Sequence, residues 1–450
     1  MQNLQTDTVF SNLYIQYHQI DQEGIEEVQR GTGHWALSVT AQGLSRLKKQ
    51  TTLYGKALYN MGQTHQVAWR EVGDYDRLRP YGLADDFSGE LIKRSYSFIG
   101  GWAKEHCNYS FGLSGKYLAQ ASFRKTDPRP LNISSRAEIE ASAGVFSYNL
   151  NTLFCLDLGI EIYSQSNNLL FVGRKTGLFE YNMLGLGEYS QRFSGNKTDA
   201  VFKGIGGFIG IETMTDKILR TSTFLKCTDT PWVLMNINSL PLAHLRAYEL
   251  THHSIYTITP TILLYISSSV QTKQGYEGIF GAGIDVAYPK LGEELRYNGI
   301  DYRGEVALQR QWTRGKYTFA YLPKIVCQGR KESYTTKQKE IKLNNIYASL
   351  SLRLEKQIHT LSTGVETTIG SRLNTHNSMK GMETTDKPIL NMLLQNIKQQ
   401  SSPYSYVDLK VLAKKRSSRL TYYGTLQSHT YKVWGGSTHF SYSFTLGLEL

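Results

Sequence analysis

The sequence is poor in cysteine and proline, and it has no long apolar run. Its 450 residues include 4 cysteines and 10 prolines, against 40 glycines and 30 tyrosines. Four cysteines exclude a disulfide-dense secreted scaffold. Low proline beside abundant tyrosine fits neither a disordered tail nor a collagen-like fibre. No stretch approaches the about 18–20 apolar residues of a membrane-spanning helix. The chain is therefore either soluble or a transmembrane β-barrel.

Signals for catalysis are scarce as well. There is no phosphate-binding glycine loop with Lys-Ser/Thr, and no HExxH, CxxC or GxSxG motif. The adjacent pair His252-His253 falls in an expected link and suggests no third metal ligand. We therefore expect no enzyme, no metal and no cofactor. A barrel enzyme is kept as the last alternative, and it predicts a hydroxyl and a histidine meeting at one rim.

The four cysteines stand far apart, and three of them fall in expected strands. We expect them to be unpaired and buried against barrel or lipid, not metal ligands. They are Cys107, Cys155, Cys227 and Cys327.

The start of the chain has no basic region followed by an apolar one. It is typical of a processed N-terminus, which predicts a signal peptide that is removed or absent from this sequence. The other interpretation is a cytoplasmic start.

The last segment carries the strongest positive pattern. Large apolar residues alternate with small or polar ones from His439 to Leu450. Period two gives one apolar and one polar face. The run exceeds the about 5–6 residues of a usual soluble strand and reaches the about 9–11 of a tilted transmembrane strand. A closed sheet pairs every backbone group without an edge, as a bilayer requires.

The same alternation recurs along the chain, and the links between the expected strands are alternately short and long. This is typical of outer-membrane barrels with short periplasmic turns and long external loops. We predict an all-β fold: a single large antiparallel up-and-down transmembrane β-barrel, with a range of fourteen to eighteen strands. The full set of eighteen is 34–42, 51–60, 65–72, 91–102, 108–118, 137–147, 152–163, 201–212, 218–227, 259–270, 276–287, 303–312, 316–328, 345–354, 359–370, 404–413, 419–428 and 438–450.

Two segments stand outside this pattern. Residues 1–30 are polar and mixed, so we expect a periplasmic segment or plug there and the barrel over 31–450. Residues 389–398 have helical spacing and follow Pro388 in a long external link. We expect a loop helix that packs on the rim or folds into the lumen; the alternative is a gate or a partner-docking helix.

The face opposite lipid carries charge. Pairing about residues 148–151 places Glu138 near Glu161 and Asp157 near Ser142 on neighbouring strands. Like charges face each other only when water, a cation or a basic side chain offsets them. We therefore expect either a solvated, self-compensating lumen or a charge-lined pathway. The candidate lumen residues are Glu138, Glu140, Asp157, Glu161, Lys316, Lys324, Arg353, Lys410 and Arg419.

The net charge of +12 is spread over links and lumen faces. A single basic stripe is missing, so we expect no nucleic-acid partner. Anionic headgroups of the outer-membrane lipid are the partner that this charge suits.

The start at Gln2, the tyrosine-rich long strands and the alternating strand that ends at Leu450 resemble Bacteroidota-type outer-membrane β-barrel proteins of unknown function. The resemblance implies the bacterial outer membrane, and a neighbouring transporter or surface lipoprotein as partner. Our leading hypothesis is a pore, or accessory transport of a polar solute through a charge-lined lumen. The alternative is a structural or assembly subunit that docks partners through its external loops.

Overall fold

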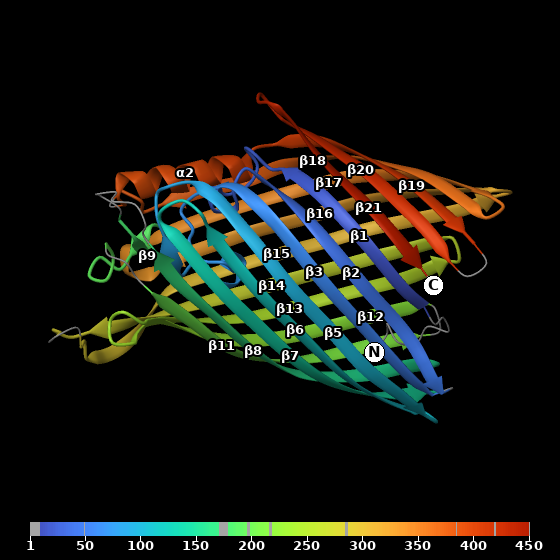
Figure 1. Cartoon of the computed structure of the whole chain (residues 1–450), viewed down its shortest axis with the longest axis horizontal. Helices are drawn as coiled ribbons and strands as arrows, with labels where there is room; N and C mark the ends of the chain where they lie inside the picture. The colour runs from blue at the N-terminus through green and yellow to red at the C-terminus, as the bar shows by residue number, and fades with distance from the viewer. Residues whose placement is uncertain are drawn as a thin grey trace.

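The computed structural model is a closed barrel of 18 antiparallel strands (Figure 1). It describes residues 10–48, 50–170, 179–195, 199–215, 218–283, 287–383, 385–417 and 420–449. Each wall strand pairs with the next along the chain, and β1 also pairs with β21 to close the ring. The wall strands are β1 Phe10–Asp21, β2 Gly33–Lys48, β3 Thr51–Val67, β5 Gly89–His106, β6 Tyr109–Arg124, β7 Arg129–Ser147, β8 Thr152–Leu170, β11 Ala200–Thr215, β12 Leu219–Leu234, β13 Leu240–Thr259, β14 Ile262–Phe280, β15 Lys290–Arg314, β16 Tyr317–Tyr334, β17 Lys339–Ile358, β18 Leu361–Lys380, β19 Tyr404–Arg416, β20 Thr421–Val433 and β21 Thr438–Glu449.

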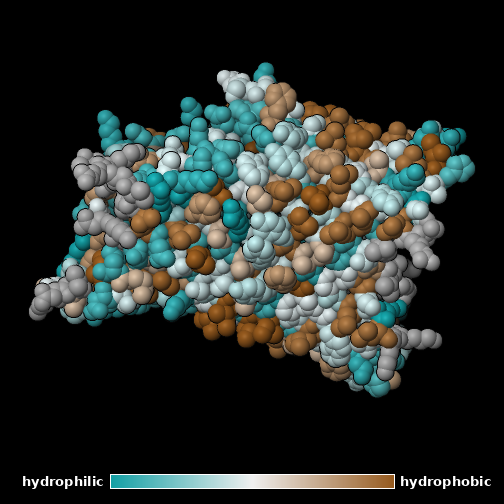
Figure 2. Space-filling model, in the orientation of Figure 1, coloured by the Kyte–Doolittle hydropathy of each residue, from teal (hydrophilic) through white to brown (hydrophobic). Residues whose placement is uncertain are grey.

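The outer surface of the wall is apolar. In β21, Phe440 is 68% exposed and Leu446 is 53% exposed, while His439 between the outward residues is buried. Figure 2 shows hydrophilic residues gathered at the end that carries α2, and apolar residues spread over the strands toward the other end. An outward apolar face on a closed sheet is the architecture of outer-membrane barrels. The expected all-β transmembrane barrel is confirmed, although Leu450 itself lies outside the described residues.

The two ends of the barrel differ. At one end, the turn end, successive strands are joined by short turns such as 107–108 and 315–316. The other end, the link end, carries the long links 22–32, 68–88, 171–199 and 381–403, together with several short ones. The expected difference between short turns and long loops therefore holds for the ends, but not for every link. Among the described residues no helix is long and apolar enough to cross a membrane.

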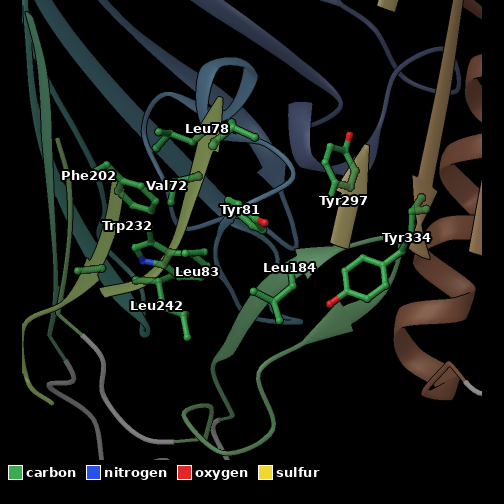
Figure 3. Packing of buried hydrophobic residues seen from close by; sticks show 14 of the residues in the cluster. Val72, Leu78, Tyr81, Leu83, Leu184, Phe202, Trp232, Leu242, Tyr297 and Tyr334 are labelled. Atoms are coloured by element: carbon green, nitrogen blue, oxygen red, sulfur yellow. The ribbon is translucent and has the colours of Figure 1, made fainter. Parts of the chain in front are cut away.

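The long links fold into the lumen instead of standing above it. They contain η2 Val28–Arg30, α1 Tyr75–Leu78, β4 Gly82–Ala84, β9 Tyr181–Gly185, β10 Glu188–Tyr189 and α2 Lys387–Ser401, and the short link after β16 holds η3 Thr335–Lys337. Strands β10, β9 and β4 form a small sheet of their own. Its apolar side chains meet those of the wall in one buried cluster (Figure 3). We call the described residues of these inserted links, 22–32, 68–88, 179–195, 381–383 and 385–403, the inner cap.

The strand count is as predicted, but the strands are not all the predicted ones. The expected hairpin about Met61–Thr64 is the single strand β3, and the one about residues 271–275 is the single strand β14. Each expected turn contains a glycine, Gly62 or Gly275. The glycine lies within the strand instead, where another group approaches it closely. A Cβ on Gly62 would lie 2.3 Å from the Trp35 carbonyl oxygen, and one on Gly275 would lie 2.2 Å from the Tyr81 hydroxyl.

Two strands were missed in return. All of strand β13 except Thr259 lies in the expected link 228–258, and the strand contains His252-His253. Strand β1 lies within residues 1–30, where we expected a periplasmic segment or plug. Its inward face carries Tyr14 and His18 where smaller polar residues would mark a clear alternation. The helix expected at 389–398 is α2, and its Ile389 is buried in the lumen.

Candidate functional site

The acidic patch lies on the inner face of the wall with the predicted register. Glu138 pairs with Glu161, and Ser142 pairs with Asp157, on β7 and β8. Glu161 and Asp157 are buried. Two basic groups reach this patch. Lys226 Nζ of β12 lies 2.7 Å from Glu161 and 3.7 Å from Glu138.

The second basic group comes from the inner cap. Arg77 Nη2 lies 2.8 Å from Glu161 Oε1, and its guanidinium sits 4.1 Å from the centroid of the Tyr163 ring. An arginine that is stacked and ion-paired holds its place better than a flexible lysine. Neither Glu140 nor Asp157 makes an ion pair with another described residue. The inner cap therefore binds the acidic patch at Glu161, through Arg77.

The basic candidates on the inner face are interspersed with acidic residues. Lys324 Nζ lies 3.8 Å from Glu305, and Arg353 Nη2 lies 2.7 Å from Glu355, so each has an acidic neighbour on the inner face. Lys410 faces the lumen on β19 in register with Glu366. Lys316 lies in the turn between β15 and β16, because β16 begins only at Tyr317. Arg419 lies outside the described residues.

Three cysteines and the histidine pair lie in wall strands, and Cys107 lies in the turn between β5 and β6. None of these four described cysteines forms a disulfide; Cys155 is buried in β8 and the other three are exposed. His252 makes hydrogen bonds with the hydroxyls of Thr223 and Ser254. Its neighbour His253 points to the other face of β13, since successive strand residues alternate.

A buried ion network joins the inner cap to the wall strands β15 and β16. Its centre is Glu27, of which 3% is exposed. The Glu27 carboxylate accepts hydrogen bonds from Arg330, from Arg79 Nη1 at 3.3 Å and from the Tyr75 hydroxyl at 3.0 Å. Gln400 Nε2 of α2 donates to it at 2.8 Å. One carboxylate thus connects two links, α2 and the wall.

The two arginines of this network are shared with wall carboxylates. Arg79 Nη2 lies 3.2 Å from both Asp301 and Glu332, and Arg330 Nε lies 3.0 Å from Asp301. We call Glu27, Arg79, Asp301, Arg330 and Glu332 the ion network. Removing one partner from such a buried group is costly, because it leaves the others unpaired.

Electrostatics favour the charged form of Glu27. Its burial raises its pKa, but the Arg330 and Arg79 guanidiniums outweigh this and hold the pKa well below its ordinary value. Burial lowers the pKa of Arg79, and Glu332, Glu27 and Asp301 outweigh that and raise it. Both groups are therefore charged at neutral pH.

The cap is held differently on its two sides. Toward β11–β13 it packs through apolar side chains around Phe202 and Trp232, which stack at 5.5 Å (Figure 3). Toward β15–β18 the cluster continues through Tyr297, Tyr334 and Ile341. On this side the cap is also held by the ion network and by Arg372, which donates to the carbonyl oxygens of Ile25, Gln399 and Ser402. The side toward β15–β18 therefore carries buried charged groups that water would hydrate if the cap separated there.

A cavity of about 310 Å³ lies on the polar side. Charged residues of both signs line it, from link 22–32 and from the wall. They include Glu26, Glu249, Asp301, Arg303, Arg330 and Arg372. The sequence did not predict this site, because the long links were expected to be external loops and residues 1–30 a periplasmic segment or plug. Nothing in the alternation of a strand shows which link folds inward.

The sequence profile of a family of unknown function (DUF6850) matches residues 1–450. No curated protein matches the chain. Among solved structures it is similar to BauA, the ferric preacinetobactin receptor from Acinetobacter baumannii, with 7% identity, a TM-score of 0.46 and coverage of 99% of this chain and 80% of that one. FpvA of P. aeruginosa, bound to a heterologous pyoverdine, shows 7% identity, a TM-score of 0.44 and coverage of 98% and 72%. The ferric citrate transporter FecA shows 9% identity, a TM-score of 0.41 and coverage of 98% and 78%. At this distance the likeness says nothing about what this chain binds.

Proposed function

For this chain, which belongs to the DUF6850 family, we propose a gated transport barrel of the bacterial outer membrane. It carries a polar solute along the charged side of its lumen. Barrels of 16–18 strands are wide enough for an aqueous channel, so this lumen would conduct if nothing filled it. The inner cap fills its link end. The barrel is therefore a pore that its own links keep closed.

One observation carries the proposal: the ion network and Arg372 join the cap to β15–β18, and a polar cavity lies at this contact. We call this contact the ionic seam. The ion network and Arg372 hold the cap against β15–β18, and the cavity of about 310 Å³ is lined by residues of the same seam. Charged groups separate into water at much lower cost than an apolar core does. Opening along the seam would join the cavity to the turn end and give a charge-lined path.

Conductance in planar bilayers tests this directly. Wild-type protein should be closed for most of the time, and a variant with a weakened seam should open. Glu27→Gln weakens the seam. Glu340→Gln in β17 is the control, because in the described part of the chain Glu340 pairs with Lys331 and Lys342, which lie outside the network. A barrel that conducts in no variant, and that co-purifies with a stoichiometric partner, would instead support the docking subunit.

A further inference from the structure

A serine, a histidine and an aspartate meet at the link end of the barrel, where the first strand β1 pairs with the last strand β21. Ser437 Oγ lies 2.6 Å from His439 Nε2, and His439 Nδ1 lies 3.0 Å from Asp21 Oδ2. Ser437 is in the link between β20 and β21, His439 is in β21 and Asp21 ends β1. We propose that these residues form a nucleophile–base–acid triad that hydrolyses carboxylic esters. This activity is independent of the transport function.

The order of contacts matches the chemistry of acyl transfer. A histidine whose Nδ1–H donates to an ionised aspartate has its Nε2 free to accept the proton of a serine hydroxyl. Both heavy-atom distances lie in the range where a nucleophile, its base and an orienting group act together. A hydroxyl and a histidine meeting at one rim is also the arrangement that a barrel enzyme predicts.

Exposure divides as such a site requires. Ser437 is exposed, so an ester can reach it from water, while His439 is only 8% exposed and sheltered from competing solvent. Tyr431 fixes the imidazole: the two rings stack at 4.8 Å with 15° between their planes. The Tyr431 hydroxyl also lies 3.4 Å from Asp21 Oδ1.

The turn before Ser437 offers donors for the oxyanion. The N–H of Gly436 bonds the carbonyl of Val433, but the N–H groups of Gly435 and Ser437 donate to no residue in the described part of the chain. A Cβ on Gly435 would meet nothing within 4 Å, so there is open space over the turn. A nucleophile's own N–H is a usual oxyanion donor.

Two other histidines show what sets this cluster apart. His429 bonds Asp408 on the neighbouring strands, but no hydroxyl among the described residues bonds its other nitrogen. His252 has hydroxyls of Thr223 and Ser254 on its two nitrogens and no carboxylate. Among these three histidines, only His439 has a hydroxyl on one side and a carboxylate on the other.

The reaction balances with water as the second substrate. Ser437 Oγ attacks the ester carbonyl while His439 Nε2 takes its proton, and the N–H groups of the turn stabilise the oxyanion. His439 returns the proton to the departing alcohol, which leaves an acyl-Ser437 ester. Water then gives a proton to His439 and its oxygen to the acyl group, and the carboxylic acid departs as Ser437 regains its proton.

The test uses the full-length barrel in detergent, with p-nitrophenyl butyrate as substrate and a fluorophosphonate probe as label. We expect hydrolysis and labelling at Ser437, and loss of both in Ser437→Ala and His439→Gln, by up to about 10⁶-fold in turnover. Asp21 is a positioning residue, so Asp21→Asn should lower turnover by about 10⁴-fold and shift its pH profile. Unchanged heat-modifiable migration shows that each variant still folds.

The controls distinguish hydrolysis by the triad from hydrolysis by a different serine or histidine, or by a bound metal ion. His429→Gln and Ser254→Ala should hydrolyse and label like the wild type. Glu23 lies close enough to Asp21 and His439 that the three could hold a metal ion, so Glu23→Gln and chelation with EDTA should leave hydrolysis unchanged. Loss of activity in Glu23→Gln or with EDTA would overturn the triad. Labelling that persists in Ser437→Ala would overturn it as well. So would a wild type that neither hydrolyses the ester nor takes the probe.

Discussion

Replacing Glu27 by glutamine should open the barrel without unfolding it. The carboxylate is 3% exposed and accepts from Arg330, Arg79, Tyr75 and Gln400. Breaking a buried charge pair costs about 3–5 kcal/mol. Because the two arginines keep Asp301 and Glu332, we expect the low end, about 3 kcal/mol. This loss falls on the closed state alone, since in the open state water hydrates the arginines.

At about 1.4 kcal/mol per tenfold change, this raises the open-to-closed ratio by about a hundredfold. Single-channel recording in planar bilayers measures the fraction of time spent open, and heat-modifiable migration reports that the barrel remains folded. Glu340→Gln should behave as the wild type. If Glu27→Gln stays as closed as Glu340→Gln while both are folded, the ion network does not hold the cap shut.

The same contacts predict three more outcomes. Because the pKa of Glu27 is depressed in the folded protein, its contribution to the stability of the closed state is complete above the ordinary glutamate value of about 4.3. This contribution is lost as pH falls through the lower folded value. Wild-type opening should therefore rise only in acid, and Glu27→Gln should lack this rise. Trp232→Ala removes a side chain that is 0% exposed and should lower the stability of the barrel by about 3–5 kcal/mol. The loss is measured as a lower temperature for the heat-modifiable shift. Trp312→Ala, at a side chain that is 43% exposed, should lower this temperature far less. Arg77→Gln should destabilise the barrel through loss of the Glu161 ion pair, and a double-mutant cycle with Glu161→Gln should show coupling; additive losses would contradict the pairing.

The parts of the fold that could be predicted from sequence are those that lipid dictates. In β21 every second residue must be apolar, so the alternation shows the strand and its faces. The same rule places Glu138 opposite Glu161, because the register follows from a turn of known length. Glycine is ambiguous under this rule: Gly62 and Gly275 lie in segments expected to be turns, and the structure uses them for close packing within strands.

The site could not be predicted in this way. The ion network brings Glu27 and Arg79 from two links against Arg330 of the wall. Such contacts depend on which links fold inward, and this is decided by tertiary packing instead of by local alternation. The triad has the same origin, since ring closure alone brings Asp21 of β1 to His439 of β21. Only His439 gave a local signal, as a polar residue on the inward face.

In the proposed transport barrel, the inner cap alone closes a wide lumen. The most direct test of this closure is the conductance of a barrel in which residues 68–88 are replaced by a short glycine-serine link. That link supplies Arg77 and Arg79 as well as part of the apolar core, so we predict large, steady conductance where the wild type is mostly closed. A folded, membrane-inserted barrel that lacks the link and still does not conduct would contradict the account.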